Sequence, residues 1–173
     1  RAQHRGGKGV TGMTTKEEDE IAQILAANTH DDIYFFTNKG RVFKIKVYDL
    51  PEGSRQAKGQ AIVNLINIEQ DEALAAILAL GKSTQAKFLL MVTSRGTVKK
   101  TKLSEFDSIR QSGKISIKLD QGDILQWVKP TTGSDHVLLV SYEGKSIKFK
   151  DEDVRATARD TMGVKGIGLK SGD

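Results

Sequence analysis

Lysine recurs at two fixed positions in three similar segments of this 173-residue sequence, residues 33–47, 89–103 and 137–151. Each segment has an apolar run, a polar turn with a glycine, and a second alternating run. The fourth residue after the turn glycine is the first-position lysine (Lys44, Lys100 and Lys148), and the sixth is the second-position lysine (Lys46, Lys102 and Lys150). Residues two apart share one face of a strand, so each segment should present two ammonium groups side by side. Such a pair suits a phosphate backbone and carries no base information, whereas the alternative is a solvated face that protects a sheet edge.

The opposite strand faces should pack inward, because they carry Phe43 and Ile45 in the first segment and Ile147 and Phe149 in the third. The middle segment departs from this pattern, with Lys99 and Thr101 at these positions.

A second basic cluster lies near the start of the sequence, in the motif QHRGGKG, which comprises Gln3, His4, Arg5, Gly6, Gly7, Lys8 and Gly9. No acidic residue precedes Glu17. Glycine lets the backbone approach a phosphate closely and leaves its N–H groups available, while arginine offers a planar fork and lysine a point charge. The motif therefore predicts a phosphate-contact loop, with a flexible basic end as the alternative.

Catalytic and cofactor patterns are not apparent in the sequence. The glycines at positions 7, 9 and 12 match a dinucleotide-binding pattern, but no strand precedes them and related glycines recur at 163, 166 and 168. His4, His30 and His136 lack metal-ligand spacing, and cysteine is missing as a nucleophile or thiolate ligand. We therefore predict no catalytic residues, no metal site and no cofactor in this chain.

Internal repeats predict the fold class. Four glycine-centred segments align without gaps on Gly9, Gly59, Gly113 and Gly163, at spacings of 50, 54 and 50 residues. The lysine-bearing segments between them have the pattern of β-hairpins, with turn glycines at 40, 96 and 144 that need positive φ. Four short strands in each unit of about 50 residues are typical of propeller blades. We expect an all-β, propeller-like domain over 1–173, with units at 9–58, 59–112, 113–162 and 163–173.

Two segments locally favour helix, and the repeat contradicts them. Residues 17–28 have capping-box spacing, and residues 69–80 are rich in alanine and leucine. The third equivalent, residues 122–130, follows a Gly-Asp turn and has the pattern of a strand. Equivalent positions of a repeat share structure, so we predict strand for all three.

The composition favours a polyanionic partner mildly, with a net charge of +5 and a pI of about 9.3. The longest apolar run, residues 73–80, is too short to span a bilayer, and no signal peptide is visible. The lack of cysteine fits a reducing compartment. Because the sequence does not start with methionine, we expect a fragment of a longer chain.

The QHRGGKG motif resembles the box that marks the C-terminal domain of the A subunit of DNA gyrase, except that His4 stands where that family usually has arginine or lysine. Residues 27–72, 96–106 and 113–119 are also similar to that domain. The resemblance implies a β-pinwheel of roughly six four-stranded blades with strands exchanged between neighbours, of which this chain holds about three. It also implies DNA contacts by the box residues and by perimeter residues, which comprise the six repeated lysines and Arg41, Arg55, Lys58, Arg95 and Arg110.

The resemblance further implies a function for the domain. Its basic perimeter would bind and wrap double-stranded DNA without sequence specificity and so direct negative supercoiling by the ATP-dependent holoenzyme. The cleavage tyrosine and the ATP and Mg²⁺ sites would lie elsewhere, in the rest of the gyrase A subunit and in the B subunit. The location would be the bacterial cytoplasm, on the chromosome. The alternatives are the equivalent domain of topoisomerase IV and a propeller that serves as a protein-interaction platform.

About three blades would leave strand edges unpaired, and open edges invite pairing with another chain. We expect either an open arc or a homodimer that completes the ring by strand exchange.

Overall fold

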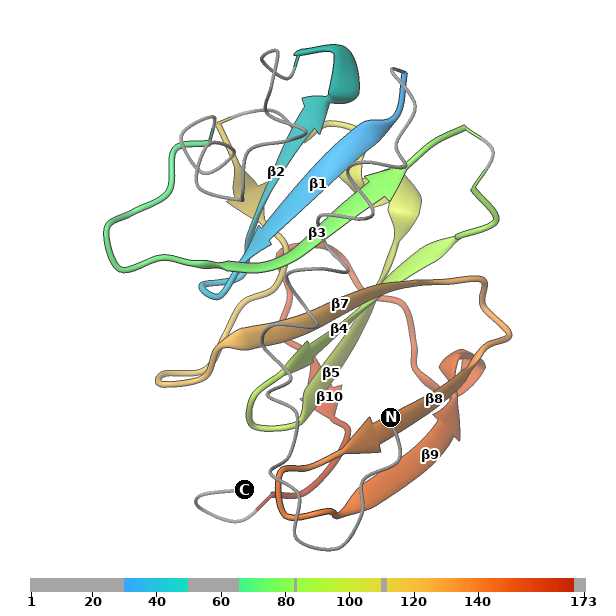
Figure 1. Ribbon diagram of the computed structural model, residues 1–173. Coiled ribbons are helices and arrows are strands. Elements are labelled where there is room, and N and C mark those ends of the chain that lie inside the picture. The colour runs from blue at the N-terminus through green and yellow to red at the C-terminus, as the bar shows by residue number, and fades with distance from the viewer. Residues whose placement is uncertain (1–29, 50–65, 83, 110–111, 170–173) are drawn as a thin grey trace, which may run out of the picture.

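Three β-hairpins follow one another along the chain, and each begins a separate sheet (Figure 1). The computed structural model describes residues 30–49, 66–82, 84–109 and 112–169. The hairpins are β1 (Asp32–Thr37) with β2 (Arg41–Lys46), β4 (Phe88–Thr93) with β5 (Thr97–Lys102), and β8 (His136–Val140) with β9 (Ser146–Lys150). All three are antiparallel, as the alternating runs predict.

Glycine closes each hairpin turn in the left-handed region, as predicted. The φ angles are +80° at Gly40, +85° at Gly96 and +88° at Gly144. Each glycine N–H donates to the carbonyl of the residue three positions earlier, at 3.0 Å in all three turns. No other described residue type has positive φ, so the turn chemistry is read directly from the sequence.

An inner strand pairs with the first strand of each of the first two hairpins. β3 (Leu74–Leu80) pairs with β1, and β7 (Leu125–Thr131) pairs with β4. The prediction of strand in 69–80 and 122–130 is therefore confirmed within these bounds, while 17–28 lies outside the described residues. Residues 75–78 of β3 are all buried. Burial on both faces of the sheet outweighs the local helix propensity of an Ala- and Leu-rich sequence.

An outer strand comes to each complete sheet from beyond the next hairpin. β6 (Lys114–Ile115) pairs with β2, and β10 (Val164–Lys165) pairs with β5. The two four-stranded orders are β3-β1-β2-β6 and β10-β5-β4-β7. The predicted exchange of strands between neighbours is thus present. The sheets differ from the glycine-to-glycine units, because β3 falls in the unit 59–112 but completes the sheet of β1.

The chain that follows each outer strand closes onto an earlier turn glycine. Ser116 and Ile117 donate their N–H groups to the Gly40 carbonyl at 2.7 and 3.3 Å. Gly166 and Ile167 make the same pair of bonds to the Gly96 carbonyl, at 2.8 and 3.1 Å. The repeat therefore preserves a tertiary contact as well as a local turn.

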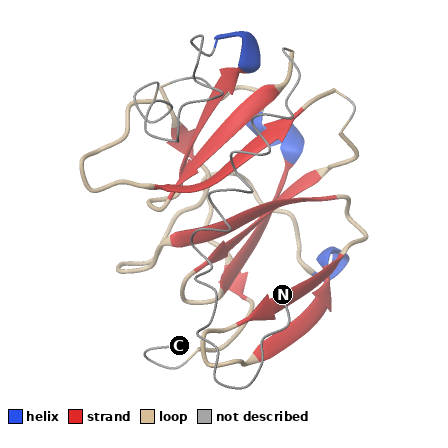
Figure 2. Ribbon diagram, viewed as in Figure 1, coloured by secondary structure: helices blue, strands red, loops and turns tan. Residues whose placement is uncertain are grey.

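Helix is confined, in the described ranges, to three 3₁₀ turns that follow the second strands of the hairpins (Figure 2). They are η1 (Val47–Asp49), η2 (Leu103–Phe106) and η3 (Asp151–Asp153). None of these described helices is long enough to cross a membrane. The main core lies between the first two sheets, where Phe36 of β1 packs with Leu89 and Met91 of β4 and with Phe106 of η2.

The turn glycines allow a matched test of the contact between units. In Gly40→Ala the new Cβ would lie 2.4 Å from the Ile117 carbonyl oxygen, whereas in Gly144→Ala it would meet nothing within 4 Å. Both variants carry the left-handed backbone cost of roughly 1–2 kcal/mol, and only Gly40→Ala adds a backbone clash. We expect Gly40→Ala to lose at least about 1 kcal/mol more free energy of unfolding in urea titrations followed by circular dichroism. Equal losses would show that the closing contact is unimportant.

Candidate nucleic-acid interface

The six repeated lysines occupy equivalent backbone positions. The first-position lysines Lys44, Lys100 and Lys148 lie opposite Tyr34, Leu90 and Leu138 in their hairpins. The second-position lysines Lys46, Lys102 and Lys150 lie opposite Asp32, Phe88 and His136. Their predicted alignment along the strands is confirmed, so any difference among them comes from what surrounds each side chain.

The first-position lysines of the complete sheets bind the following unit. Lys44 Nζ donates to the Asp107 carbonyl at 3.0 Å, just after η2. Lys100 Nζ donates to the Asp151 carbonyl at 2.8 Å and to Asp151 Oδ1 at 3.2 Å, at the start of η3. Lys100 is only 5% exposed and lies over the Phe88 ring. The prediction that Lys100 lies on the perimeter is therefore wrong, and Lys44 is half-buried in the same type of contact.

Asp151, which accepts both hydrogen bonds from the Lys100 ammonium, is fully buried. Burial by itself would raise the pKa of the Asp151 carboxyl. Hydrogen bonds from the Gly133 N–H and the Lys100 ammonium, among others, outweigh burial and hold this pKa below its ordinary value. Lys100 therefore forms its ion pair with a buried carboxylate, at 3.2 Å, inside the protein.

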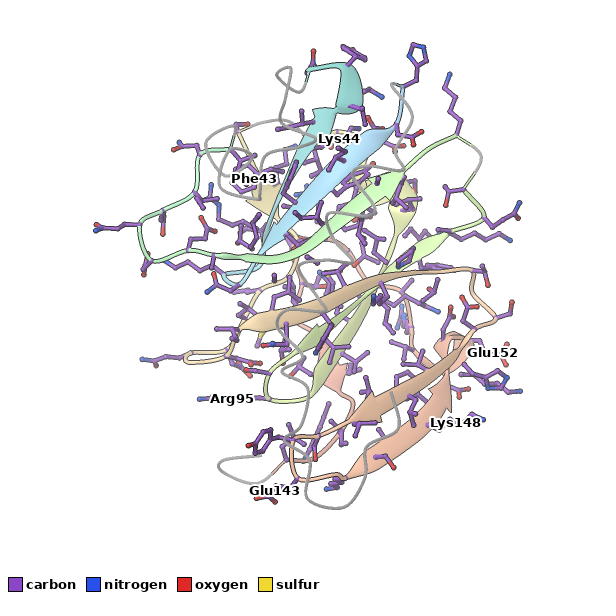
Figure 3. All side chains as sticks on the ribbon, viewed as in Figure 1. Phe43, Lys44, Arg95, Glu143, Lys148 and Glu152 are labelled. Carbon is purple, nitrogen blue, oxygen red and sulfur yellow. The ribbon has the colours of Figure 1, made fainter. Side chains whose placement is uncertain are left out.

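Lys148 differs because no described segment covers it. It is exposed on β9, and within the described ranges it forms no ion pair. Figure 3 shows Lys148 at the far end of the molecule from Lys44. The difference between two equivalent lysines thus follows from the presence or absence of a described neighbouring unit.

The second-position lysines remain closer to solvent. Lys102 is exposed and has no ion pair in the described part of the chain. Lys150 is paired with Glu152 at 3.6 Å, and both side chains are 57% exposed. Lys46 lies 2.5 Å from Asp32 Oδ1, and this carboxylate raises the pKa of Lys46 above its ordinary value. Lys102 and Lys150 are therefore second-position lysines that a phosphate could reach, as is the exposed first-position Lys148, whereas Lys46 is already bound by a carboxylate.

The two described arginines predicted as perimeter residues have different roles. Arg41 is half-buried and binds the buried Glu72 at 2.9 Å, so its charge stabilises the first hairpin. Arg95 is exposed at the tip of the β4–β5 hairpin and donates to the Gln121 carbonyl at 3.0 Å. In Figure 3 Arg95 and Lys148 lie on opposite sides of the lower half of the molecule, so these two candidates do not form one compact patch.

The remaining predicted DNA-contact residues lie outside the described residues. They are Gln3, His4, Arg5, Gly6, Gly7, Lys8, Gly9, Arg55, Lys58 and Arg110. Their contacts with DNA stay predictions.

Sequence reasoning missed the lysines of the outer strands. Lys114 of β6 and Lys165 of β10 are both exposed, at the outer edges of the two complete sheets. A signal for them exists, because each lies within two residues of a glycine shared by the four repeat segments, as do Lys8 and Lys58. Their position became evident only when the exchanged strands were seen to form the sheet edges.

Lys99 is a buried cation that bridges two exchanged segments. It is 1% exposed, and its Nζ donates to the Ser116 carbonyl at 2.7 Å and to the Arg159 carbonyl at 2.5 Å. The equivalent position in the first sheet is Phe43, which is buried as predicted. Burial lowers the pKa of Lys99 to about 8, and the nearby carboxylates Asp160 and Glu105 offset this only in part.

The fold and the candidate interface define the class of the molecule as a propeller-like repeat protein with exchanged strands and lysines along its outer strands. Among the residues that the structure describes, no group of three His, Asp or Glu side chains could hold a metal ion. The chain belongs to the DNA gyrase C-terminal domain family, described as a beta-propeller, which it matches over residues 1–28, 31–80, 87–132 and 135–173.

Curated relatives support this membership. The chain is 50% identical to the DNA gyrase A subunit of Escherichia coli (strain K12) over 172 residues, which is 99% of this chain and 20% of that protein. It is 44% identical to the DNA gyrase A subunit of Staphylococcus aureus (strain NCTC 8325) over 174 residues, again 20% of that protein. The chain thus spans about a fifth of the length of these relatives.

Solved structures agree on the fold. A crystal structure of the C-terminal domain of DNA topoisomerase IV matches with a TM-score of 0.74 and 33% identity, covering 84% of this chain and 45% of that one. A DNA gyrase A C-terminal domain matches with a TM-score of 0.66 and 30% identity, covering 84% and 46%. The predicted all-β, β-pinwheel class is confirmed.

The buried Lys99 predicts a pH dependence of stability. Between pH about 8 and its ordinary value of 10.5, the lysine is protonated in the unfolded chain and neutral in the folded one. The unfolded state then binds more protons, so the free energy of unfolding rises with pH. Relative to Lys99→Met, the wild type should gain up to about 3 kcal/mol across this window. Denaturant titrations at pH 7, 8, 9 and 10 measure the difference, and a constant difference would contradict a lowered pKa.

Proposed function

We propose that this domain binds double-stranded DNA without sequence specificity, through lysines on the outer part of each sheet. The observation that carries the proposal is the exposure of Lys102, Lys150, Lys114 and Lys165, which lie on second hairpin strands or on outer strands of successive sheets. Exposed ammonium groups on separate sheets match a repeating phosphate backbone, and they offer no planar fork to recognise a base edge.

Wrapping of DNA is consistent with this distribution of charge. Bending 20–30 bp smoothly by 40–90° costs roughly 1–6 kcal/mol, and a wrap bends the duplex further. Many weak phosphate contacts, each of which releases counterions, can offset this cost when they recur along a curved array. The repeated sheets supply such contacts one after another.

We further propose that the domain acts within a longer gyrase-type enzyme. In this role it presents wrapped DNA to the rest of the A subunit and to the B subunit, and so directs ATP-dependent negative supercoiling on the bacterial chromosome in the cytoplasm. The relatives that carry the gyrase name, of which this chain spans 20%, support the proposal. Strand cleavage and the use of ATP and Mg²⁺ are assigned to the other parts of that enzyme.

The equivalent domain of topoisomerase IV is the second candidate, and the TM-score of 0.74 to such a domain favours it. The nearly intact QHRGGKG motif favours the gyrase role, because the box is typical of gyrase and is degraded or missing in its relative. The two roles differ in whether the box contributes to trapped DNA writhe. A third role, a platform for protein partners, predicts no retardation of plain duplex in a gel-shift assay.

Salt dependence tests the DNA-binding proposal. The logarithm of the binding constant for linear duplex should fall linearly with the logarithm of salt concentration, with a slope of about −0.9 for each phosphate contact. Lys102→Ala should make this slope shallower by about 0.9, because it removes one exposed ammonium group. Fluorescence anisotropy between low and moderate salt measures both slopes.

Lys39→Ala is the matched control, since it removes one charge that Glu69 and Asp71 already neutralise at 2.8 and 2.7 Å. It should leave the slope unchanged. An affinity for duplex that barely responds to salt would refute phosphate binding, and equal effects of the two variants would refute the assignment to Lys102.

Arg5→Ala combined with Lys8→Ala tests the box in a gyrase holoenzyme that carries the whole C-terminal domain. The pair should abolish wrapping more than binding, because the exposed lysines of the sheets still hold phosphates. Ligation of nicked circular DNA measures the trapped writhe. Lys102→Ala with Lys150→Ala removes the same charge and should lower affinity while bound protein still traps writhe. Unchanged writhe in the box variant would count against the gyrase role.

A further inference from the structure

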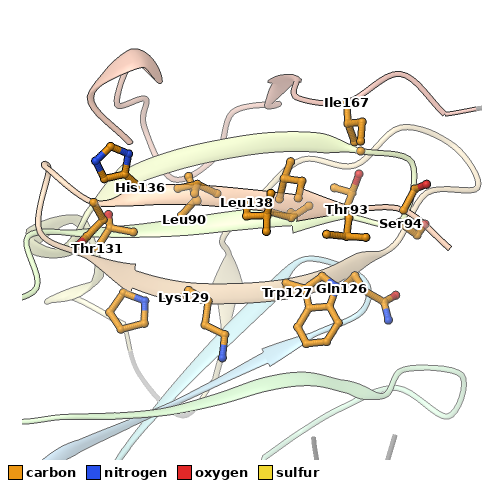
Figure 4. A pocket seen from close by; sticks show the side chains of 18 of the residues that line it. Leu90, Thr93, Ser94, Gln126, Trp127, Lys129, Thr131, His136, Leu138 and Ile167 are labelled. Carbon is orange, nitrogen blue, oxygen red and sulfur yellow. The ribbon is translucent and has the colours of Figure 1, made fainter. Parts of the chain in front are cut away.

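The outer strands β6 and β10 are each fixed to their own hairpin by the chain that follows them. After β6 the Ser116 N–H donates to the Gly40 carbonyl at 2.7 Å, and after β10 the Ile167 N–H donates to the Gly96 carbonyl at 3.1 Å. Figure 4 shows Ile167 at the same end of a pocket as Thr93, which precedes the Gly96 turn. These contacts hold each outer strand within its sheet, and they do not fix the separation between the two sheets.

A separate junction links the two sheets at their outer side, where residues 115–118 meet residues 159–161. The Lys118 N–H donates to the Thr161 carbonyl at 3.0 Å. The Arg159 N–H donates to Glu105 Oε2 of η2 at 2.9 Å, which holds the second segment against the second sheet. The first segment continues from β6 and the second leads to β10, so the junction connects the two outer strands.

Lys99 of β5 lies inside this junction. It is opposite Met91, which packs in the core between the two sheets, so its side chain points toward the first sheet. Its ammonium donates to the Ser116 carbonyl at 2.7 Å and to the Arg159 carbonyl at 2.5 Å. A single buried cation therefore binds both segments of the junction.

The Arg159 side chain adds a contact at the open edge of the first sheet. The Ser116 N–H points toward Gly40, so the Ile115 carbonyl of the same trans peptide points away from β2. Arg159 Nη1 donates to this carbonyl at 3.1 Å. Lys114, the other residue of β6, is exposed beside this contact. The junction thus lies next to a lysine of the proposed DNA-binding surface.

The Lys99 contact belongs to this junction and not to the repeat as a whole. Phe43, at the equivalent position of the first sheet, has no polar group to make it. Ser116 is fully buried, so without the Lys99 ammonium its carbonyl would lose a donor that water cannot readily replace. Asp160 and Glu105 attract the ammonium and Arg159 repels it, so the nearby acids offset part of the cost of its burial.

We propose that Lys99 is a positioning residue for DNA, which fixes the separation between Lys114 of β6 and Lys165 of β10. The inference rests on the proposed DNA-binding role of those two lysines. It assigns Lys99 itself no contact with DNA, because Lys99 is 1% exposed. A fixed separation lets two neighbouring sheets hold one duplex along a single path. A variable separation would allow several paths and a less uniform bend.

Spin labels on Lys114→Cys and Lys165→Cys measure this separation, because both positions are exposed and the chain contains no cysteine of its own. Pulsed electron paramagnetic resonance of the 173-residue chain without DNA should give one narrow distance distribution. Lys99→Met should broaden this distribution about twofold, since the Ser116 and Arg159 carbonyls lose their shared donor. A distribution of unchanged width in Lys99→Met would overturn the proposal.

Lys100→Met is the matched control. Lys100 is the next residue of β5 and is also buried, but its ammonium binds Asp151 and not the junction. The control should leave the width of the distribution unchanged, and equal broadening by both variants would refute the assignment to Lys99. Arg159→Met removes the guanidinium contact alone and should broaden the distribution less than Lys99→Met. If Lys99→Met does not fold, an unchanged width in Arg159→Met overturns the proposal.

Trapped writhe tests the consequence for DNA. In a gyrase holoenzyme that carries the whole C-terminal domain, Lys99→Met should lower the writhe trapped on ligation of nicked circular DNA. The salt slope for linear duplex should stay unchanged, whereas a slope shallower by about 0.9 would make Lys99 a phosphate contact and overturn the proposal. A purely stabilising role would lower the free energy of unfolding and leave the writhe trapped by bound protein unchanged.

The two measurements separate the failure of this inference from the failure of the proposed function. The distance distribution is measured without DNA and so reports on the junction alone. A wild-type affinity for duplex that does not respond to salt would refute DNA binding through the lysines, and with it the positioning role of Lys99. A broadened distribution with unchanged writhe would overturn the positioning role and leave DNA binding intact.

Discussion

The carbonyl of each turn glycine in the two complete sheets accepts two backbone hydrogen bonds from a segment beyond the next hairpin, and the rest of the architecture depends on this contact. Gly40 receives Ser116 and Ile117, and Gly96 receives Gly166 and Ile167. A hairpin can therefore complete its outer edge only when the following hairpin has been passed. Stability is shared between neighbouring units, as in other repeat proteins, because no described unit contains all four strands of its own sheet.

The same sharing determines which lysines remain available to a ligand. Lys44 and Lys100 lie where the next unit's chain passes, so their ammonium groups bind its carbonyls. Leaving the buried Asp151 carbonyl without a donor would cost about 1–3 kcal/mol, which gives Lys100 a structural role without any nucleic acid. Lys102, two residues after Lys100, lies beyond this contact and remains exposed, as does Lys150 at the same position of the third hairpin. A regular sequence repeat thus contains two kinds of lysine, one that binds the neighbouring unit and one that is exposed to solvent.

Local chemistry explains what the sequence predicted well. Positive φ at Gly40, Gly96 and Gly144 follows from hairpin turn geometry, and the strand in residues 69–80 follows from comparison with residues 122–130. The burial of Lys100 could not be predicted, because it depends on Asp151, 51 residues away, in a buried pair. The assignment of strands to sheets could not be predicted for the same reason, because glycine spacing gives the period of the sequence and not which strands pair. The exposed Lys114 was missed until β6 was seen to form a sheet edge.

The inner and outer strands of each sheet separate two kinds of interaction. β3 packs against β7 at the inner side, where a strand must match apolar side chains and a buried acid. β6 and β10 form the outer edges, where Lys114 and Lys165 face solvent. For the proposed binding of phosphate groups, an electrostatic attraction screened by water is sufficient at these lysines. β9 is the second strand of the third hairpin, and its Lys150 is exposed. The proposed phosphate contacts and the packing of the inner strands therefore involve different strands of each sheet.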